Sequence, residues 1–284
     1  MQQGMESTRR TNRSSLLAHL TARIDSLPRF RPILVAIDGR SAAGKTSLAD
    51  ELAEALRAAG REVIRVEIDD FHRPAYKERA IRGDFTPESY VREGYDFATF
   101  RRFVLDPLAP GGSRQIRTRY WNWQQDEPYP DEAIQVADGM AVIVDGIYLL
   151  LPELDGTGTD DTAGLRSGDR DERATTGVAP TDAGAERAVA GASLTRVWDL
   201  SIWVEVDWET MIERAMQRDI AWTGDGEVVR DRYVRYWIPR HQYYETALHP
   251  RDRADIVIDN TNIDAPAVLR GQHNARPATD EPES

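Results

Sequence analysis

The sequence predicts an α/β fold in which helices cover both faces of a doubly wound, mainly parallel sheet. Short apolar runs at 33–37 and 141–144 are typical of strands that are buried on both faces. The first run is followed by a glycine-bounded loop, a helical pattern at 45–59 and a strand pattern at 62–68. A strand, a helix and a strand in this order indicate a parallel pair joined by a right-handed crossover.

The remaining elements follow from the apolar periodicity. Residues 71–95 are polar and aromatic without clear periodicity, and we interpret them as a substrate-side loop region. A helix is expected at about 96–106, with weaker strand candidates at 115–121 and 133–136. Further along the chain, we expect strands at 200–206 and 254–259 and helices at 208–220 and 227–246.

Composition divides the chain into one domain with appended segments. An amphipathic helical pattern covers 7–27. Residues 155–193 consist mostly of Gly, Ala, Thr, Asp and Arg, which cannot bury enough apolar surface to offset the entropy of ordering. The predicted organisation is a helical extension at 1–30, a domain in two parts at 31–154 and 194–262, a disordered insertion at 155–193 and a C-terminal tail at 263–284.

Charge and composition exclude several classes of protein. The chain of 284 residues has a formal net charge of −12 and contains no cysteine. The negative charge opposes binding to nucleic acid polymers, and the absence of cysteine excludes disulfides and thiolate metal sites. The sequence has no apolar run long enough to span a membrane and no secretory signal pattern. We therefore expect a cytoplasmic protein that acts on a small-molecule substrate, with a homo-oligomer left open.

Residues 39–46 have the sequence GRSAAGKT, which matches the phosphate-binding loop G-x-x-x-x-G-K-[ST] between a strand and a helix. Backbone N–H groups of such a loop and the N-terminus of the following helix bind nucleotide phosphates. Lys45 is expected to reach the β- and γ-oxygens, and the Thr46 hydroxyl to bind Mg²⁺. The sequence therefore predicts a P-loop NTPase fold that binds ATP or GTP with Mg²⁺. The predicted nucleotide-binding residues are Gly39, Arg40, Ser41, Ala42, Ala43, Gly44, Lys45, Thr46 and Ser47.

Acidic residues stand where strands of the predicted sheet end. Ligands of a doubly wound sheet bind beyond the carboxyl ends of its strands, so these positions are candidates for catalysis. Asp145 ends the run at 141–144 and is predicted to bind Mg²⁺, directly or through water. Asp69 ends the strand after the loop helix and is predicted to be the general base for an acceptor hydroxyl, with a role at the metal also open. Asp70 is the alternative base.

Aromatic and polar residues of the substrate-side region are candidates for binding the acceptor. Tyr90 and Tyr95, and the segment with Tyr120, Trp121 and Trp123, provide faces that can stack on a flat acceptor such as a nucleobase. His72 follows the two acids directly, and Asp96 has a carboxylate suited to ribose hydroxyls. The predicted acceptor-binding residues are Asp70, His72, Tyr95, Asp96, Tyr120 and Trp123.

Four motifs occur in order along the chain. They are the loop at 39–46, IDDFHR at 68–73, VIVDG at 142–146, and Arg214 with Arg218 and Asp219, followed by Tyr233, Pro239 and ADIV at 254–257. Together these motifs resemble the uridine kinase and phosphoribulokinase group of P-loop kinases, especially its uridine kinase-like bacterial members. The resemblance runs from about residue 31 to 260, interrupted by the predicted insertion.

The resemblance implies phosphorylation of the 5′-hydroxyl of a nucleoside such as uridine or cytidine, with Asp69 as the general base. It also implies a helical lid, in which Arg214 and Arg218 lie on a lid helix and hold phosphates or substrate as the site closes. Two arginines one helical turn apart share a face and can bind an anion together. With Lys45, these residues form the predicted catalytic set.

Departures from the family pattern keep other functions open. The lid turn at 222–227 carries acids where the family has glycine and arginine, the segment at 120–125 has no histidine, and residue 145 is Asp where better-known members have Glu. One alternative is a kinase of the same architecture that acts on another alcohol, such as a pantothenate-like compound or a sugar. Another is a nucleotide-switch protein in which ATP orders the segment 220–246.

Overall fold

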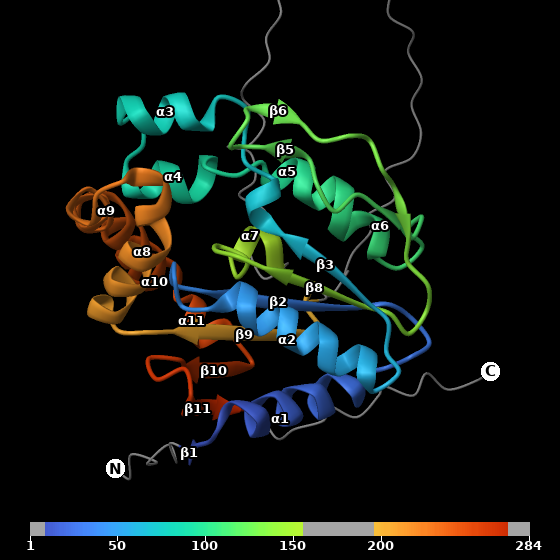
Figure 1. Ribbon diagram of the computed structural model, residues 1–284. Coiled ribbons are helices and arrows are strands. Elements are labelled where there is room, and N and C mark those ends of the chain that lie inside the picture. Colours follow the sequence, from blue (N-terminus) through green and yellow to red (C-terminus); the bar gives the residue numbers. More distant parts are fainter. Residues whose placement is uncertain (1–8, 156–195, 272–284) are drawn as a thin grey trace, which may run out of the picture.

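A computed structural model describes residues 9–155 and 196–271. In these ranges helices cover both faces of a central sheet, and a further group of helices lies at one end of it (Figure 1). The predicted insertion lies almost entirely outside the described residues, as does the last part of the predicted tail. The doubly wound α/β fold predicted from the sequence is confirmed.

The central sheet of the described residues has seven strands in the order β1-β11-β10-β9-β2-β8-β3. The five strands from β10 to β3 are parallel, and β11 pairs antiparallel with both β10 and β1. The chain proceeds from β2 to β3 and β8 on one side and to β9 and β10 on the other, so the strand order reverses at β2. Ligands of such sheets bind at this reversal. The parallel strands are β2 (Ile33–Gly39), β3 (Val63–Glu67), β8 (Ala141–Asp145), β9 (Leu200–Glu205) and β10 (Ile256–Asp259).

Alternate residues of the strands face two separate apolar cores. In β2, Ile33, Val35 and Ile37 pack with α1 (Arg13–Asp25) and α2 (Lys45–Ala58), whereas the residues between them pack on the opposite side. All of these residues are buried. Coverage of both faces explains why the strand is continuously apolar in sequence. Figure 1 shows α1 and α2 together on one face of the sheet.

The opposite face is filled by large aromatic side chains from short helices, from β9 and from α10 (Ile238–Leu248). Tyr90, Phe100, Trp203 and Tyr244 are buried together in this core. The short helices of the described part are α3 (Tyr76–Arg82), α4 (Pro87–Glu93), α5 (Phe97–Phe100), α6 (Asp106–Leu108), α7 (Pro152–Asp155) and α11 (Pro250–Arg253), with a π-helical turn at Arg101–Leu105 between α5 and α6.

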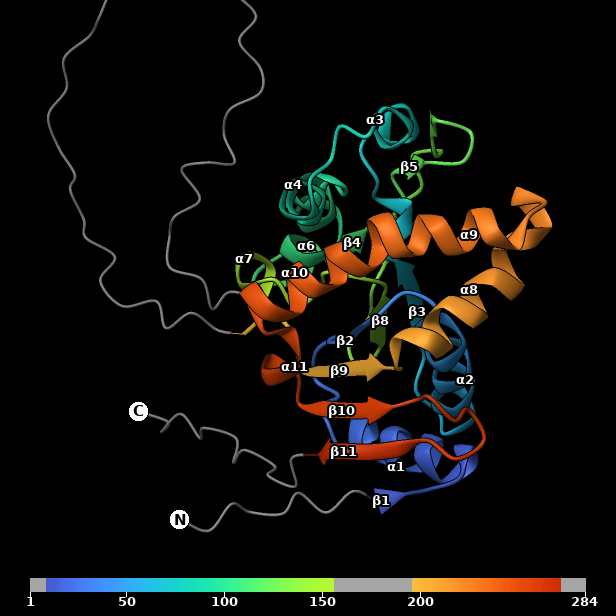
Figure 2. The ribbon, with the colours of Figure 1, turned by 90° about the vertical axis from the view of Figure 1, so that its left-hand side faces the viewer.

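The predicted lid consists of helices at the carboxyl ends of the strands. Asp207 caps α8 (Trp208–Thr223) by accepting from the Thr210 N–H. A glycine in the left-handed region, Gly224, then reverses the chain into α9 (Gly226–Arg232). A π-helical turn at Tyr233–Trp237 joins α9 to α10 (Ile238–Leu248). Figure 2 shows the continuous helical segment from α9 to α10 crossing the end of the sheet. Because α10 also packs against α4, the lid lies beside the substrate-side region.

The substrate-side region also contains two small antiparallel pairs. One joins β4 (Gln115–Ile116) to β7 (Ile134–Gln135), and the other joins β5 (Trp121–Asn122) to β6 (Glu127–Pro128). These strands fall in or beside the segments predicted as weak strands, but each has only two residues. They lie outside the central sheet.

Two predictions about the chain ends are wrong in extent. The first helix begins at Arg13 and is preceded by β1 (Arg9–Arg10), whereas the helical pattern was expected from residue 7. Residues placed in the tail form β11 (Ala267–Gly271), a strand of the central sheet, so the domain extends beyond 262 to at least 271. Only Ala267 of β11 is buried, and this short, half-exposed strand carries little apolar signal in the sequence.

Candidate active site

The phosphate loop lies between β2 and α2, and two of its glycines are required by the backbone. Gly39 has a φ of 149°, and a Cβ there would lie 2.0 Å from the Val204 carbonyl oxygen on β9. Gly44 has a φ of 86° and caps α2 in the left-handed conformation. The loop therefore passes very close to its neighbours, with backbone N–H groups and a helix N-terminus available for an anion. This geometry fits the phosphates of a nucleotide.

Side chains from distant segments fix the loop. The Ser41 N–H donates to His241 Nε2 at 3.1 Å, and Asn260 Nδ2 donates to the Ala43 carbonyl oxygen at 2.7 Å. Arg40 donates to both oxygens of Glu245 at 2.7 and 2.6 Å and stacks on Trp208 at 3.7 Å. The loop is therefore connected to α8, to α10 and to the end of β10. Burial lowers the pKa of His241 well below its usual value, so the ring is neutral and its Nε2 accepts.

A cavity of about 940 Å³ opens between the phosphate loop, the ends of β3 and β8, and the lid. Most of the predicted site residues line this cavity, although they come from distant parts of the sequence. They are Ser41, Ala42, Gly44, Lys45, Thr46, Ser47, Asp69, His72, Tyr95, Trp123, Asp145, Arg214 and Arg218. Gly39, Arg40, Ala43, Asp70, Asp96 and Tyr120 do not line it.

The predicted acceptor residues outside the cavity have structural partners. The Asp96 carboxylate caps α5 by accepting from the Thr99 N–H at 2.9 Å and the Thr99 hydroxyl at 3.0 Å. Asp70 forms an ion pair with Arg119 at 3.4 Å. Tyr120 packs edge-on against another ring of the substrate-side region. These side chains therefore help to hold the fold beside the cavity.

Lys45 lies at the bottom of the loop and is 8% exposed. Its ammonium group donates to the Arg40 carbonyl oxygen at 2.7 Å. Burial lowers the pKa of Lys45 to about 8, and the charges of Asp38, Asp69 and Asp145 act in the opposite direction. The Lys45 ammonium group can therefore turn from the Arg40 carbonyl to phosphate oxygens that enter the loop.

Thr46 and Asp145 meet at the start of α2 and the end of β8. The Thr46 hydroxyl donates to Asp145 Oδ2 at 2.7 Å, and Arg65 forms an ion pair with the same carboxylate. Hydroxyl and carboxylate oxygens are the donors that Mg²⁺ prefers, and Mg²⁺ bound with phosphates needs only one or two protein ligands. The described ranges contain no cluster of three or more His, Cys, Asp or Glu side chains that could hold a metal ion. The residues present fit a magnesium ion that shares its ligands with a nucleotide.

Asp69 lies in a 3₁₀ turn at Ile68–Asp70, directly after β3. The Tyr95 hydroxyl donates to Asp69 Oδ1 at 2.8 Å, and no group in the described residues donates to Oδ2. His72 Nδ1 lies 2.8 Å from the Asp69 carbonyl oxygen, and burial lowers the pKa of His72. Asp69 is therefore fixed by one oxygen and presents the other to the cavity.

The predicted lid arginines both line the cavity, and both have protein partners. Arg214 donates to the carbonyl oxygens of Asn260 and Thr261 at 2.9 and 3.0 Å. Arg218 pairs with Asp219 at 2.6 Å and donates to the Tyr233 hydroxyl at 3.0 Å. Arg214 thus fastens the lid to the end of β10, and Arg218 lies nearer to Lys45, whose pKa its charge lowers.

Several cavity residues were not assigned to the site from the sequence. Glu67 ends β3, and burial, together with nearby acids, raises its pKa. Tyr233, Trp237 and Arg240 line the cavity from the lid at the i, i+4 and i+7 positions of one helical face. That spacing is the signal in the sequence that could have identified them. The others are Tyr76, Lys77, Ala80, Gln124, Gly146, Ile147, Asp219, Arg232 and Tyr236.

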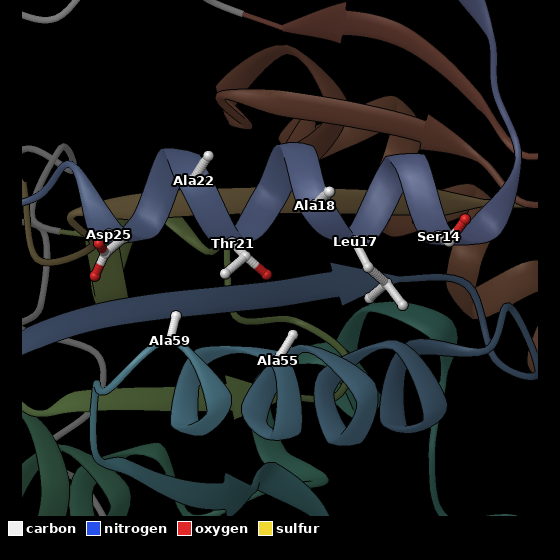
Figure 3. Close-up of a pocket in the computed structure, with 8 residues that line it drawn as sticks. All are labelled: Ser14, Leu17, Ala18, Thr21, Ala22, Asp25, Ala55 and Ala59. Atoms are coloured by element: carbon white, nitrogen blue, oxygen red, sulfur yellow. The ribbon is translucent and has the colours of Figure 1, made fainter.

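A second cavity of about 530 Å³ lies between α1 and the end of α2 (Figure 3). Its walls are mainly small or apolar side chains, among them Leu17, Ala22 and Ala55, with Asp25 at one end. It lacks the cations and the convergent polar groups that phosphate transfer needs. The reaction site is therefore assigned to the cavity under the lid.

A phosphate loop after the central parallel strand, acids at the ends of the neighbouring strands and a helical lid together define a P-loop kinase fold. Solved structures agree with this class. A Bacillus stearothermophilus protein described as a possible uridine kinase is 16% identical, with a TM-score of 0.53 and coverage of 86% of this chain and 97% of the other. A candidate fructose transport system kinase from Silicibacter sp. TM1040 is 22% identical, with a TM-score of 0.51 and coverage of 82% and 93%.

This likeness shows that the chain has the fold of the uridine kinase-like P-loop kinases. No family model matches the sequence, and no curated protein sequence matches it. Within the described ranges, none of the helices has both the length and the apolar character that a membrane span requires.

Proposed function

We propose that the protein transfers the γ-phosphoryl group of ATP to a hydroxyl of a small molecule. The observation that carries this proposal is the convergence of Lys45, Thr46, Asp145 and Asp69 on one cavity under a helical lid. The first three residues suit a nucleotide with its metal. Asp69 suits the acceptor, because one of its oxygens is held by Tyr95 and the other receives no hydrogen bond from the described residues.

Each residue has a defined task in this proposal. The loop N–H groups and Lys45 bind the phosphates and stabilise the charge on the transferred group. Thr46 and Asp145 would hold Mg²⁺, which neutralises charge on the phosphate oxygens when bound. Asp69 orients the acceptor hydroxyl and takes its proton, with a contact to the metal as the second role predicted from the sequence. Closure of the lid with Arg214 and Arg218 excludes water from the site.

The acceptor that the family resemblance implies is a nucleoside. In its support, Trp123 and Tyr236 line the cavity with aromatic rings that are not fully buried. The alternative acceptors, a sugar and a pantothenate-like alcohol, offer the same hydroxyl chemistry. A pantothenate-like alcohol differs in that it also carries a carboxylate.

Release of ADP tests the proposal. The purified protein with Mg²⁺ and ATP or GTP is incubated with uridine, cytidine, pantothenate and common sugars, and one acceptor is expected to stimulate formation of ADP from ATP or of GDP from GTP. Lys45→Ala should reduce kcat/KM by about 100-fold or more, comparable to loss of one oxyanion donor. Its melting temperature, measured in parallel, separates lost chemistry from lost folding. Slow hydrolysis that no acceptor stimulates would favour the nucleotide-switch alternative.

A further inference from the structure

Arg240 lies in the first turn of α10 and lines the cavity, although it is only 6% exposed. Its guanidinium carbon lies 3.7 Å from the centre of the Tyr90 ring on α4. The rings of Trp237 and Tyr236, at 5.3 and 5.8 Å, belong to the same lid segment. The charge is thus held among aromatic rings at the contact between α10 and α4.

Arg240 has no anionic partner in the described part of the chain. No carboxylate there lies within ion-pair distance of it, and its guanidinium donates no hydrogen bond to these residues. The other cavity arginines differ, because Arg214 donates to two carbonyl oxygens and Arg218 pairs with Asp219. Arg240 thus combines a nearly complete burial with unused donors.

A buried cation without an anion is unfavourable, because aromatic rings replace only part of its lost hydration. A guanidinium is also a planar fork of donors that matches a carboxylate or a phosphate in a bidentate contact. Because Arg240 lines the cavity, an anion in the cavity can reach these donors. The side chain is therefore preorganised for an anionic group of a ligand.

A second polar group in the same neighbourhood lacks a partner. The Tyr148 hydroxyl is buried and makes no hydrogen bond with the described residues. Burial raises the pKa of Tyr148, and the charge of Arg240 opposes part of this effect. Tyr148 therefore stays protonated, and its ring packs edge-on 6.1 Å from Tyr90, the ring that Arg240 contacts, without lining the cavity itself.

The contact of Arg240 with Tyr90 places it at the substrate-side region, although its charge also acts on His241, which binds the Ser41 N–H of the phosphate loop. Its charge acts on Tyr76 and Tyr90, whose hydroxyls are 3.1 Å apart. The Tyr76 ring in turn lies 4.2 Å from His72, which contacts the Asp69 backbone. The charge of Arg218, by contrast, acts on Lys45 in the phosphate loop.

We propose that the acceptor is an alcohol that carries an anionic group, a carboxylate or a phosphate, and that Arg240 binds this group while Asp69 receives the hydroxyl. This inference rests on the proposed function and narrows it. It favours the pantothenate-like class over a neutral nucleoside or sugar, because neither of these has a group that matches the unpaired guanidinium.

Matched acceptor pairs test the inference. ADP release is measured with pantothenate against panthenol, gluconate against glucose, ribose 5-phosphate against ribose, and uridine as a neutral nucleoside. In the wild type, an anionic member is expected to be the best acceptor. Arg240→Met should lower the ratio of kcat/KM for the anionic acceptor to kcat/KM for its neutral partner by roughly 100-fold, mainly through a higher KM for the anionic acceptor. Arg240→Lys should give an intermediate ratio. The matched control is Arg235→Met, on the same lid but exposed and paired with Asp231, which should leave this ratio unchanged.

A binding measurement makes the result independent of catalysis. With the phosphate loop saturated by Mg²⁺ and a non-hydrolysable ATP analogue, the anionic acceptor should raise the melting temperature of the wild type but not that of Arg240→Met. Without ligand, Arg240→Met should melt no lower than the wild type, whereas an arginine kept only for the fold would lower it. A best acceptor that is neutral, or an equal loss for both members of a pair, would overturn the inference and leave the kinase proposal intact. Binding of the anion by Arg240 without ADP release from any acceptor would instead remove the kinase proposal.

Discussion

Lys45 and Asp38 are both buried at the phosphate loop, and the charge of each acts on the other. Burial lowers the pKa of Lys45 to about 8 and raises the pKa of Asp38 to about 6. Asp38 is further held by hydrogen bonds from the Tyr244 hydroxyl at 2.6 Å and the Leu150 N–H at 3.0 Å. The protein therefore carries the Lys45 charge below about pH 8 and loses it at higher pH.

This lowered pKa predicts that nucleotide affinity falls as the pH rises through about 8, because phosphates bind the protonated lysine. Between about pH 8 and the usual value of 10.5, the unfolded chain binds more protons at this residue, so the same group makes the ligand-free protein more stable as the pH rises. Bound phosphates restore the proton. Calorimetry at about pH 8.5 in two buffers of different ionisation enthalpy should therefore detect proton uptake. Lys45→Met should show none, and equal heats in both buffers for the wild type would contradict the prediction.

Asp69 and Asp70 are adjacent, but the fold gives them different surroundings. Asp69 lines the cavity, whereas Asp70 pairs with Arg119 outside its lining. Asp69→Asn is expected to lower kcat by about 10² to 10⁴ while the ATP dissociation constant changes by no more than a few fold. Asp70→Asn is the matched control and should have a far smaller effect on kcat. If single-turnover kinetics showed a larger loss of rate for Asp70→Asn than for Asp69→Asn, the base would be Asp70.

At the scale of elements, the unit of β2, loop and α2 depends on the close approach of Gly39 to β9. Gly39→Ala would place a Cβ 2.0 Å from the Val204 carbonyl oxygen, so the backbone must move. We expect a loss of about 3 kcal/mol or more in the free energy of unfolding. Gly60→Ala is the control, because Gly60 also has a positive φ but no atom within 4 Å of the added Cβ, and it should cost only about 1–2 kcal/mol. Equal losses in urea unfolding would show that strain in φ, and not the contact with β9, sets the effect.

Elements with a strong local pattern could be predicted from the sequence. The apolar run of β2, the loop and the amphipathic α2 are contiguous, so each is visible without knowledge of its neighbours. By contrast, β1, β6 and β11 were not predicted, and β4, β5 and β7 fall in or overlap segments predicted only as weak strands. Such short segments become strands only through pairing with other segments of the chain. Within the site, His241 and Asn260 were missed for the same reason, since they reach the loop only after α10 and β10 are in place.

At the scale of the molecule, β11 connects the edge strand β1 to the rest of the sheet, because it pairs with both β10 and β1. A chain truncated after Asn262 loses this strand and leaves β10 and β1 without their partner. We expect the free energy of unfolding to fall by at least about 2 kcal/mol, or folding to fail. Chemical denaturation of the truncated and full-length proteins measures the difference. If the two proteins had equal free energies of unfolding, the domain would end at residue 262, as the sequence predicts.

The sequence by itself determined the parallel α/β architecture and the phosphate loop, because both depend on residues that are close along the chain. It also placed Asp69 and Asp145 at strand ends, where a parallel sheet brings them to one edge. Only the tertiary structure decided which polar groups face the cavity and which hold the fold. Both oxygens of Asp96 accept from Thr99, whereas Arg240 is buried against Tyr90 with no carboxylate of the described residues beside it. The surroundings of Arg240 depend on the contact between α10 and α4, which are far apart in sequence.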